Sequence, residues 1–224
     1  SLTINRRGGI TKTYTLTRAV IEVPTAKYAM LDEDTAYLKI TRWTPYTEQS
    51  VKEALDYFKD RNYNSLVVDV RGNPGGLLSS VVDTADLFLD KGTIVSTKDR
   101  NLNTLEEFKA TRRLSIPKSI PIVLLTDKGS ASASEILAGA LKDTGRAYLV
   151  GDTTFGKGSV QQIRGFGDSG FKLTISRYYT PDNYNIDNIG IEPHKLLTEA
   201  ELSDAELEDL AELIEENRIA VFVN

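Results

Sequence analysis

The chain has 224 residues, with 27 basic and 32 acidic side chains, no cysteine and one histidine. These counts exclude a disulfide framework, a thiol nucleophile and cysteine-based zinc or iron–sulfur sites. One histidine, His194, cannot form a histidine-rich metal cluster, and a Ser–His–Asp triad would have to use that residue as its base. Any metal would need mostly oxygen ligands, and we expect no metal and no cofactor.

The negative charge is concentrated at one end of the chain. Residues 199–224 hold nine acids and one base, so residues 1–198 are about neutral and neither part has the basic patch of a nucleic-acid-binding protein. No apolar run approaches the roughly 20 residues of a membrane span. The first residues do not show the basic and then apolar pattern of a signal peptide.

Residue patterns predict strands in the first part of the chain. A strand is expected at residues 2–7 before the Gly8-Gly9 turn, a second over 14–23 and a third over 36–40. Thr47 is then expected to cap a helix, because apolar residues follow it at helical spacing.

The middle of the chain alternates between strand and helix. Strands are predicted at 65–70, 120–125 and 147–150, and helices follow the first two, from Leu77 and from about Ala133 to Lys142. Residues 172–179 alternate cleanly and favour an antiparallel region. This order predicts an α/β protein with parallel strands in at least one sheet. The last residues, 199–224, predict an amphipathic helix that begins with a capping box, Ser203 to Glu206, and has an apolar face made by Leu207, Leu210, Leu213 and Ile214.

Three junctions between a strand and the following segment could hold a site, because ligands of α/β proteins gather where strands end. Residues 129–135 place small residues and three serines at a helix start, where a hydroxyl could act as a nucleophile beside a helix dipole. A serine at this position is also a common helix N-cap, which is the simpler interpretation.

The junction at residues 151–158 resembles a phosphate-binding loop, yet Gly158 stands where the hydroxyl residue after Lys157 should be. The residues that follow have few helix signals, which disfavours nucleotide binding. Glycines on both sides of Lys157 suggest close backbone packing, and a lysine confined there would be desolvated, which favours the neutral amine of a general base. A Ser–Lys dyad needs no histidine, and residues 72–76 could add backbone N–H donors.

At these residues the sequence resembles the carboxyl-terminal processing proteases, also called tail-specific proteases. The resemblance spans roughly Tyr14 to Lys195 and rests on several motifs in the same order. They are residues 15–23, 68–76, 129–136, 154–161, 178–181 and 190–193.

The family implies a serine endopeptidase that cuts polypeptides near accessible C-termini, and a crotonase-like α/β fold of sheets packed with helices. Its nucleophile matches Ser132, its general base Lys157 and a lysine-positioning glutamine Gln161. The oxyanion donors would be the N–H of Ala133 and of a glycine in the pair Gly75 and Gly76. An acid on the nucleophile's helix matches Asp143 in a supporting role.

The resemblance also implies a domain organisation. Residues 1–13 would be the remnant or edge strand of a missing peptide-binding PDZ-like domain, 14–198 the protease core and 199–224 the acidic helix and tail. The resemblance implies that the protein is located in the bacterial cell envelope or periplasm. It also allows a homo-oligomer. The sequence departs from the family after Pro181 and at His194, which replaces an acid. We assign His194 no catalytic role.

Two other functions compete with this hypothesis. The chain could be a peptide-binding or scaffold module that is inactive, or active only under some conditions, without a PDZ domain. A nucleotide hydrolase is the third interpretation, based on the residues around Lys157.

Overall fold

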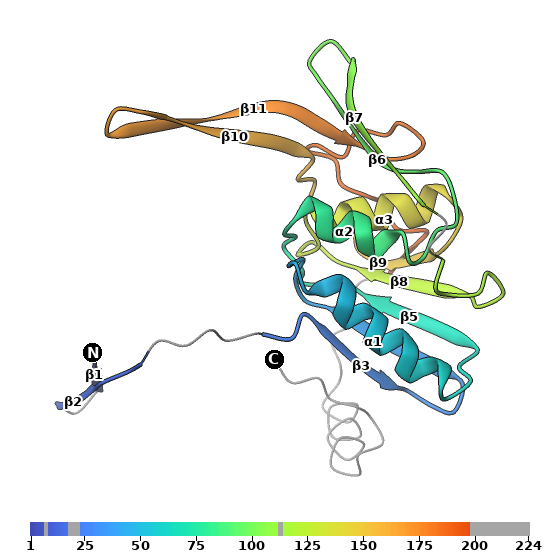
Figure 1. Ribbon diagram of the computed structural model, residues 1–224, viewed down its shortest axis with the longest axis horizontal. Helices are drawn as coiled ribbons and strands as arrows, with labels where there is room; N and C mark the ends of the chain where they lie inside the picture. The colour runs from blue at the N-terminus through green and yellow to red at the C-terminus, as the bar shows by residue number, and fades with distance from the viewer. Residues whose placement is uncertain (7–8, 18–22, 112–113, 198–224) are drawn as a thin grey trace.

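The computed structural model describes residues 1–6, 9–17, 23–111 and 114–197 (Figure 1). Among these residues the largest sheet has six strands in the order β12-β9-β8-β5-β4-β3. The pair β3–β4 is antiparallel and the other neighbouring pairs are parallel. The strands are β3 (Ala26–Met30), β4 (Thr35–Ile40), β5 (Ser65–Asp69), β8 (Ile122–Thr126), β9 (Tyr148–Gly151) and β12 (Lys195–Leu196).

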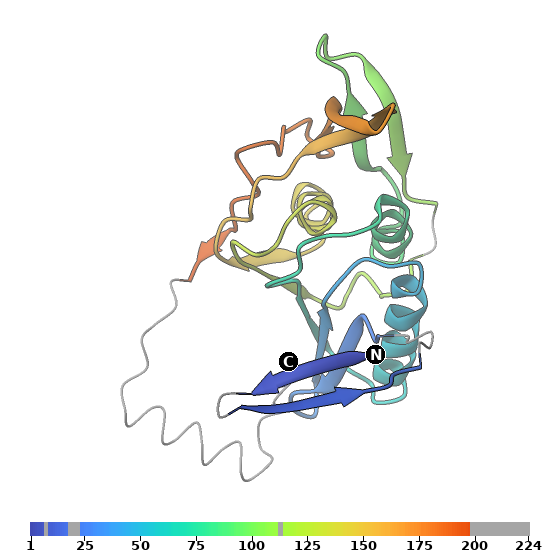
Figure 2. The same cartoon turned by 90° about the vertical axis from the view of Figure 1, so that its left-hand side faces the viewer.

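Three helices of the described residues cover one face of this sheet (Figure 2). They are α1 (Thr47–Lys59), α2 (Leu78–Ala85) and α3 (Ala133–Asp143). The core lies between them and the sheet, since every second strand residue on this side is buried, among them Leu38, Ile40, Leu66, Val68, Leu124 and Leu149. Where a parallel strand is followed by a helix, the carboxyl end of the strand lies close to the start of that helix. The candidate site lies at such a junction.

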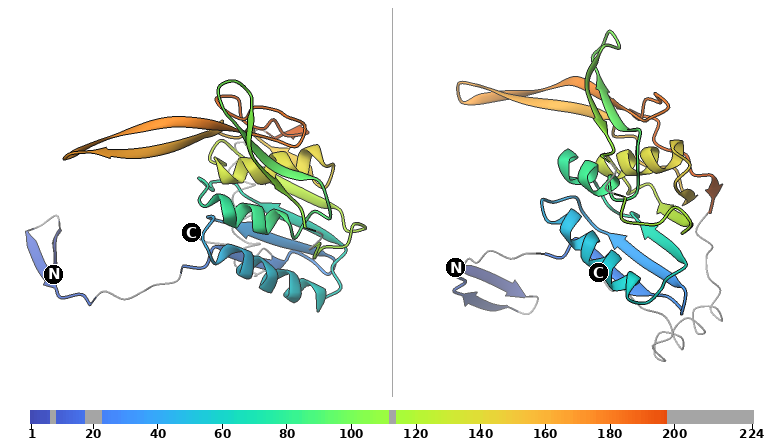
Figure 3. Two further views of the ribbon diagram at one scale, coloured as in Figure 1. Left: turned by 45° about the horizontal axis from the view of Figure 1, so that its top comes forward. Right: turned by 45° about the vertical axis from the view of Figure 1, so that its right-hand side comes forward.

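A second sheet of four antiparallel strands in the described chain has the order β10-β11-β6-β7. Its strands are β6 (Thr93–Lys98), β7 (Thr104–Lys109), β10 (Ser159–Phe166) and β11 (Ser169–Tyr179). Helix α3 contacts β9 of the first sheet and β6 of the second, so it lies between the two sheets. The hairpin β10–β11 projects from the body as a long arm (Figures 1 and 3).

The expected α/β class with parallel strands is confirmed, as are the helix from Ala133 and the antiparallel strand over 172–179. The helix predicted for 199–224 lies outside the described residues. None of the helices in the described ranges has the length and apolar content needed to cross a bilayer.

Two local predictions were wrong. A strand was expected over 14–23, but in the described part of this range only Tyr14 is in a strand. That strand is β2 (Ile10–Tyr14), which pairs with β1 (Leu2–Arg6) across a turn where Gly9 has φ 79°. Residues 15–17 are in no strand, and 18–22 lie outside the description. Thr47 is the first residue of α1 and not its cap, which is Tyr46. The buried hydroxyl of Thr47 is instead hydrogen-bonded to the Thr25 hydroxyl and accepts the Thr44 N–H.

Candidate active site

Ser132 stands at the turn that leads from β8 into α3, immediately before the first helical residue. Its backbone has φ 57° and ψ −112°, a left-handed conformation that a residue with a side chain rarely adopts. Such a conformation costs on the order of 1–3 kcal/mol and persists only where surrounding bonds enforce it. The sharp turn sets Ser132 at the positive end of the α3 dipole, where a developing negative charge is stabilised.

The structure separates the three serines of this segment. Ser130 and Ser134 are fully buried, and both hydroxyls are engaged with the main chain. Ser130 Oγ donates to the carbonyl of Val70, just after β5, at 2.8 Å. Ser134 Oγ donates to Asn73 O at 3.0 Å and accepts from Trp43 Nε1. Ser132 is partly exposed, so it is the serine of the three that a substrate can reach.

The carboxylate of Glu135 joins the two halves of the predicted dyad. Its Oε2 accepts the backbone N–H of Ser132 at 2.7 Å and that of Lys157 at 2.8 Å. Its Oε1 accepts the Gly156 N–H at 2.6 Å and the Thr154 hydroxyl at 2.7 Å. Glu135 is fully buried, so one side chain satisfies four donors and fixes the two segments relative to each other.

The loop around Lys157 is packed as closely as its glycines suggested. A Cβ on Gly156 would lie 2.9 Å from Ile189 N, and one on Gly158 would collide with Asp187 N. Gly156 also has φ 90°, which favours glycine. No residue with a side chain fits at either position without moving the backbone beside it.

The side chain of Lys157 differs from expectation. It is exposed, so its amine is not confined by the packed glycines as the sequence suggested. Within the described ranges no hydrogen bond joins its Nζ to Ser132 Oγ. The main chains of Ser132 and Lys157 are therefore brought together, whereas the lysine side chain is exposed and is not bonded to Ser132 in the described chain.

The two candidate glycines have different hydrogen-bonding roles. The N–H of Gly75 donates to Asn73 Oδ1 at 3.0 Å, whereas that of Gly76 has no acceptor among the described residues. A Cβ on Gly75 would lie only 2.8 Å from Ser132 Cβ, so this strand of backbone runs beside the serine. Ala133, at the first position of α3, also has an N–H without an acceptor in the described chain.

Gln161 and Asp143 lie farther from the serine. Gln161 is exposed on β10, directly after a bulge between Val160 and Gln161 that redirects the strand's side chains. Asp143 is the last residue of α3, about 16 Å along the helix from Ser132 at the usual rise per residue. Its Oδ2 accepts the Asp182 N–H at 3.0 Å, so Asp143 anchors the segment after β11 and does not touch the dyad.

The phosphate-loop interpretation fails its structural requirement. A phosphate-binding loop must lead into a helix, but the loop at 151–158 leads into β10, which starts at Ser159. His194 is also accounted for: its Nδ1 accepts the Leu149 N–H at 2.9 Å and its ring stacks on Tyr148.

A buried carboxylate at the end of β5 was missed as an organising group. Asp69 is fully buried and accepts the Tyr37 hydroxyl at 2.6 Å and the Arg71 guanidinium at 2.8 and 3.0 Å. Burial raises the pKa of Asp69, but the hydrogen bonds from Arg71 and Tyr37 outweigh burial and hold it below its ordinary value. Burial and the bond to Asp69 raise the pKa of Tyr37.

Sequence signals existed for some of these residues. The pattern of Ser132 followed by Glu135 three residues later is that of a capping box, which predicts the bond between them. Nothing local predicts the bond from Glu135 to Lys157, because it spans 22 residues.

Comparisons with known proteins identify the family of the chain. The family model of "Peptidase family S41" matches residues 34–196, so the chain belongs to that family. This confirms the resemblance drawn from the motifs, and the matched region lies inside the expected protease core of 14–198.

Individual relatives carry the same description. The chain is 40% identical over 200 residues to a carboxy-terminal-processing protease of Bartonella bacilliformis, covering 86% of this chain and 45% of that protein. It is 37% identical to a carboxyl-terminal-processing protease of Synechocystis, covering 89% and 47%. The chain thus spans about half the length of the curated relatives it matches.

A solved structure supports the fold. The photosystem II D1 C-terminal processing protease superposes with a TM-score of 0.73 at 30% identity, over 88% of this chain and 54% of that one.

Proposed function

We propose that this chain carries the catalytic core of a serine endopeptidase that cuts polypeptides near their C-termini, with Ser132 as nucleophile and Lys157 as general base. The observation that carries the proposal is the carboxylate of Glu135, which accepts the backbone N–H of both residues at 2.7 and 2.8 Å. Capping of α3 by Ser132 does not require a hydrogen bond between Glu135 and the Lys157 loop. The shared carboxylate therefore indicates that the positions of the two residues are coupled.

The reaction begins when the neutral amine of Lys157 takes the proton of the Ser132 hydroxyl as Oγ attacks the scissile carbonyl. The carbonyl oxygen becomes an oxyanion, which the unoccupied N–H groups of Ala133 and Gly76 would stabilise. Collapse of this intermediate breaks the C–N bond, and the lysine proton passes to the leaving amine. Water then attacks the acyl-enzyme while the Lys157 amine takes one of its protons. The lysine returns this proton to Ser132 Oγ as the ester bond breaks and the new carboxyl terminus is released.

The remaining predicted residues have indirect roles in this scheme. Gln161 would position the Lys157 amine once the exposed lysine swings towards Ser132, and the bulge before Gln161 lets the strand change direction there. Gly76 replaces the undecided pair of glycines as the oxyanion donor, because Gly75 N–H is already used. Asp143 would support the site only by anchoring the segment after β11.

Two parts of the proposal rest on the family alone. They are the preference for C-termini and the localisation in the cell envelope or periplasm. The relatives that the chain matches are named as carboxyl-terminal processing proteases of bacteria and chloroplasts. They support polypeptides as the substrate class without naming a substrate.

The direct test is cleavage of an unstructured peptide together with labelling by a fluorophosphonate, which reacts with activated serines. Ser132→Ala should abolish both, whereas Ser169→Ala, at the start of β11 in the exposed arm, should change neither. Mass spectrometry of the products should place the cuts near the C-terminus. Equal cleavage by the wild-type chain and Ser132→Ala would refute the proposal.

The exposure of the Lys157 side chain favours one alternative, a peptide-binding module whose dyad is not assembled. In that case the wild-type chain would bind the peptide but label no faster than Ser132→Ala, even with saturating peptide present.

A further inference from the structure

The two faces of the six-stranded sheet differ sharply. Helices cover one face, whereas on the other a row of partly exposed side chains runs straight across five strands. Register pairs place them side by side in the order Ala29, Tyr37, Val67, Val123 and Tyr148. Parallel sheets occur almost always with both faces covered, so this apolar row calls for a cover that the described residues do not supply.

A second row, two residues nearer the carboxyl ends of the parallel strands, is more basic. It runs in register through Lys27, Lys39, Asp69, Leu125, Val150 and Lys195. Its one carboxylate, Asp69, is already paired with Arg71, and beyond the row Lys128 pairs with Asp152. The open face thus combines an apolar strip with a border on which positive side chains outnumber the acids.

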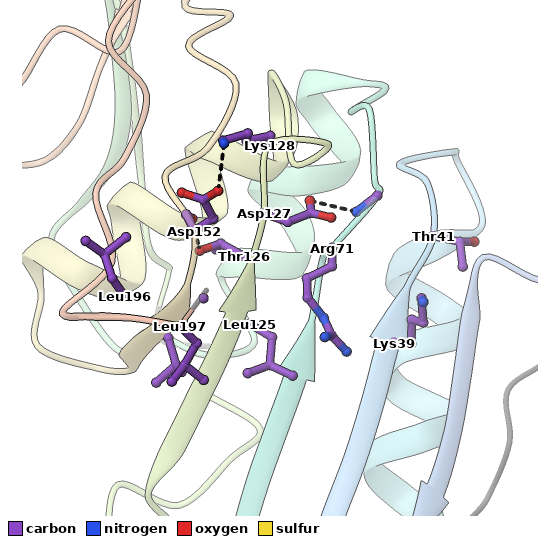
Figure 4. A pocket seen from close by; sticks show the side chains of 13 residues that line it. Lys39, Thr41, Arg71, Leu125, Thr126, Asp127, Lys128, Asp152, Leu196 and Leu197 are labelled. Carbon is purple, nitrogen blue, oxygen red and sulfur yellow. Dashed lines mark hydrogen bonds and ion pairs between the residues drawn. The ribbon is translucent and has the colours of Figure 1, made fainter. Parts of the chain in front are cut away.

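This border opens into a cavity of about 1120 Å³ at the carboxyl ends of the strands (Figure 4). Three basic residues and two acids line it, and its far wall is made by Leu196 and Leu197. The charged residues are Lys39, Arg71, Lys128, Asp127 and Asp152. Neither Ser132 nor Lys157 lines it, so the cavity is separate from the candidate active site. The last described residue stands in its wall, so the chain leaves the described fold at this cavity.

We propose that residues 199–224 of the same chain dock on this face as an amphipathic acidic helix and complete the sheet's second layer. Their nine acids and one base complement the basic border, and their leucine stripe matches the apolar row. The inference concerns the sheet and holds whether or not the chain is a peptidase.

The dimensions fit. The twelve residues from Asp204 to Glu215 span about 18 Å as a helix. The distance from β12 to β4 is four strand spacings, or about 19 Å. The short connection from Leu197 to Asp204 keeps the segment close to the cavity, so that docking within one chain is favoured over docking of a second copy by a high effective concentration.

The test uses the absence of native cysteine. Val123→Cys places a single thiol in the apolar row, and its rate of reaction with a maleimide reports how well the row is covered. Adding Leu210→Asp, which puts a charge in the tail's apolar stripe, should speed labelling about tenfold by releasing the cover. Adding Glu212→Asp is the control, because it introduces an aspartate on the opposite side of the tail helix, away from the apolar stripe. It should leave the labelling rate unchanged.

A second thiol position separates docking from unfolding. Leu105→Cys on exposed β7 should label at one rate in all tail variants. High salt should also speed labelling of Val123→Cys, because it screens the charge pairing.

Equal labelling of Val123→Cys with and without Leu210→Asp would overturn the proposal. So would protection that grows with protein concentration, because that result assigns the cover to a second copy. Loss of peptidase activity in Ser132→Ala bears on neither outcome, so failure of the docking proposal and failure of the proposed function are distinguishable.

Discussion

The two halves of the candidate dyad are held in different ways. Ser132 lies at the start of α3, which packs between both sheets, and its strained backbone is fixed within the core. Lys157 has an equally well-anchored main chain, yet its side chain is exposed and the next strand leads into the projecting β10–β11 arm. The fold therefore fixes Ser132 by packing, and it fixes the backbone of Lys157 while leaving the side chain of that residue exposed.

The largest effect that tests this contrast is expected from Lys157→Ala. Removing the proposed general base should lower kcat/KM for an unstructured peptide by about 10³-fold. Because the side chain is exposed, the free energy of unfolding should change by less than about 0.5 kcal/mol. Peptide kinetics and urea denaturation measure the two quantities separately.

A matched control is Lys128→Ala, which removes another exposed lysine from the neighbouring strand-to-helix turn. It should leave kcat/KM within about twofold, because its pairing with Asp152 lies at the surface. Marked destabilisation by Lys157→Ala would mean that the lysine side chain is packed in solution, and the contrast between the two halves would then be wrong.

Glu135→Gln should come next, because it breaks the bridge between the halves. The amide NH₂ cannot accept the N–H groups that now bond one carboxylate oxygen, so two buried donors lose their partner. We expect a loss of about 3 kcal/mol in unfolding free energy, since each unsatisfied buried donor costs about 1–3 kcal/mol. Urea denaturation measures it.

Glu107→Gln on exposed β7 is the comparison for this change and should have almost no effect on stability. A stable and fully active Glu135→Gln protein would show that the bridge is not needed to hold the two segments.

The contrast also marks the limit of what the sequence predicts. Local patterns place Ser132 at a helix start and Lys157 in a tight loop, because glycine spacing and apolar periodicity act over a few residues. They could also have placed Asp143 at the far end of α3, since the rise of a helix fixes that distance. The bonds from Glu135 to residues 154–157 depend on how distant segments pack, and so does the choice between Gly75 and Gly76.

The arm and the second sheet were partly missed for the same reason. β6 and β7 carry no strong alternation that separates them from loops, and they are strands because β11 pairs with β6. The exposure of the Lys157 side chain also has no sequence signal. It depends on what stands over the loop, which backbone packing alone does not determine.

Asp69→Asn tests electrostatics on the nucleophile's side of the molecule, with a smaller expected effect. The pKa of Asp69 lies below its ordinary value, so the ionised group stabilises the fold above the unfolded pKa near 3.9. The variant should lose about 2 kcal/mol at neutral pH, when Arg71 and Tyr37 lose a charged partner.

This difference should shrink as the pH falls through the folded pKa of Asp69, because protonation removes the same advantage from the wild-type chain. Stability measured by urea denaturation between pH 7 and pH 3 checks the trend, with exposed Asp83→Asn as the control. A constant difference over that range would contradict the assigned ion pair.

The smallest effect is expected on the arm. Phe166 is 80% exposed near the tip of β10, so Phe166→Ser removes almost no buried apolar area and should change the unfolding free energy by less than about 0.5 kcal/mol. Phe58→Ala in the buried face of α1 should cost about 3–5 kcal/mol. Thermal and urea denaturation of the two variants sets the scale. If Phe166→Ser lowered stability by several kcal/mol, the arm would have to be packed in solution, and the exposure that distinguishes the base side of the dyad from the nucleophile side would not hold.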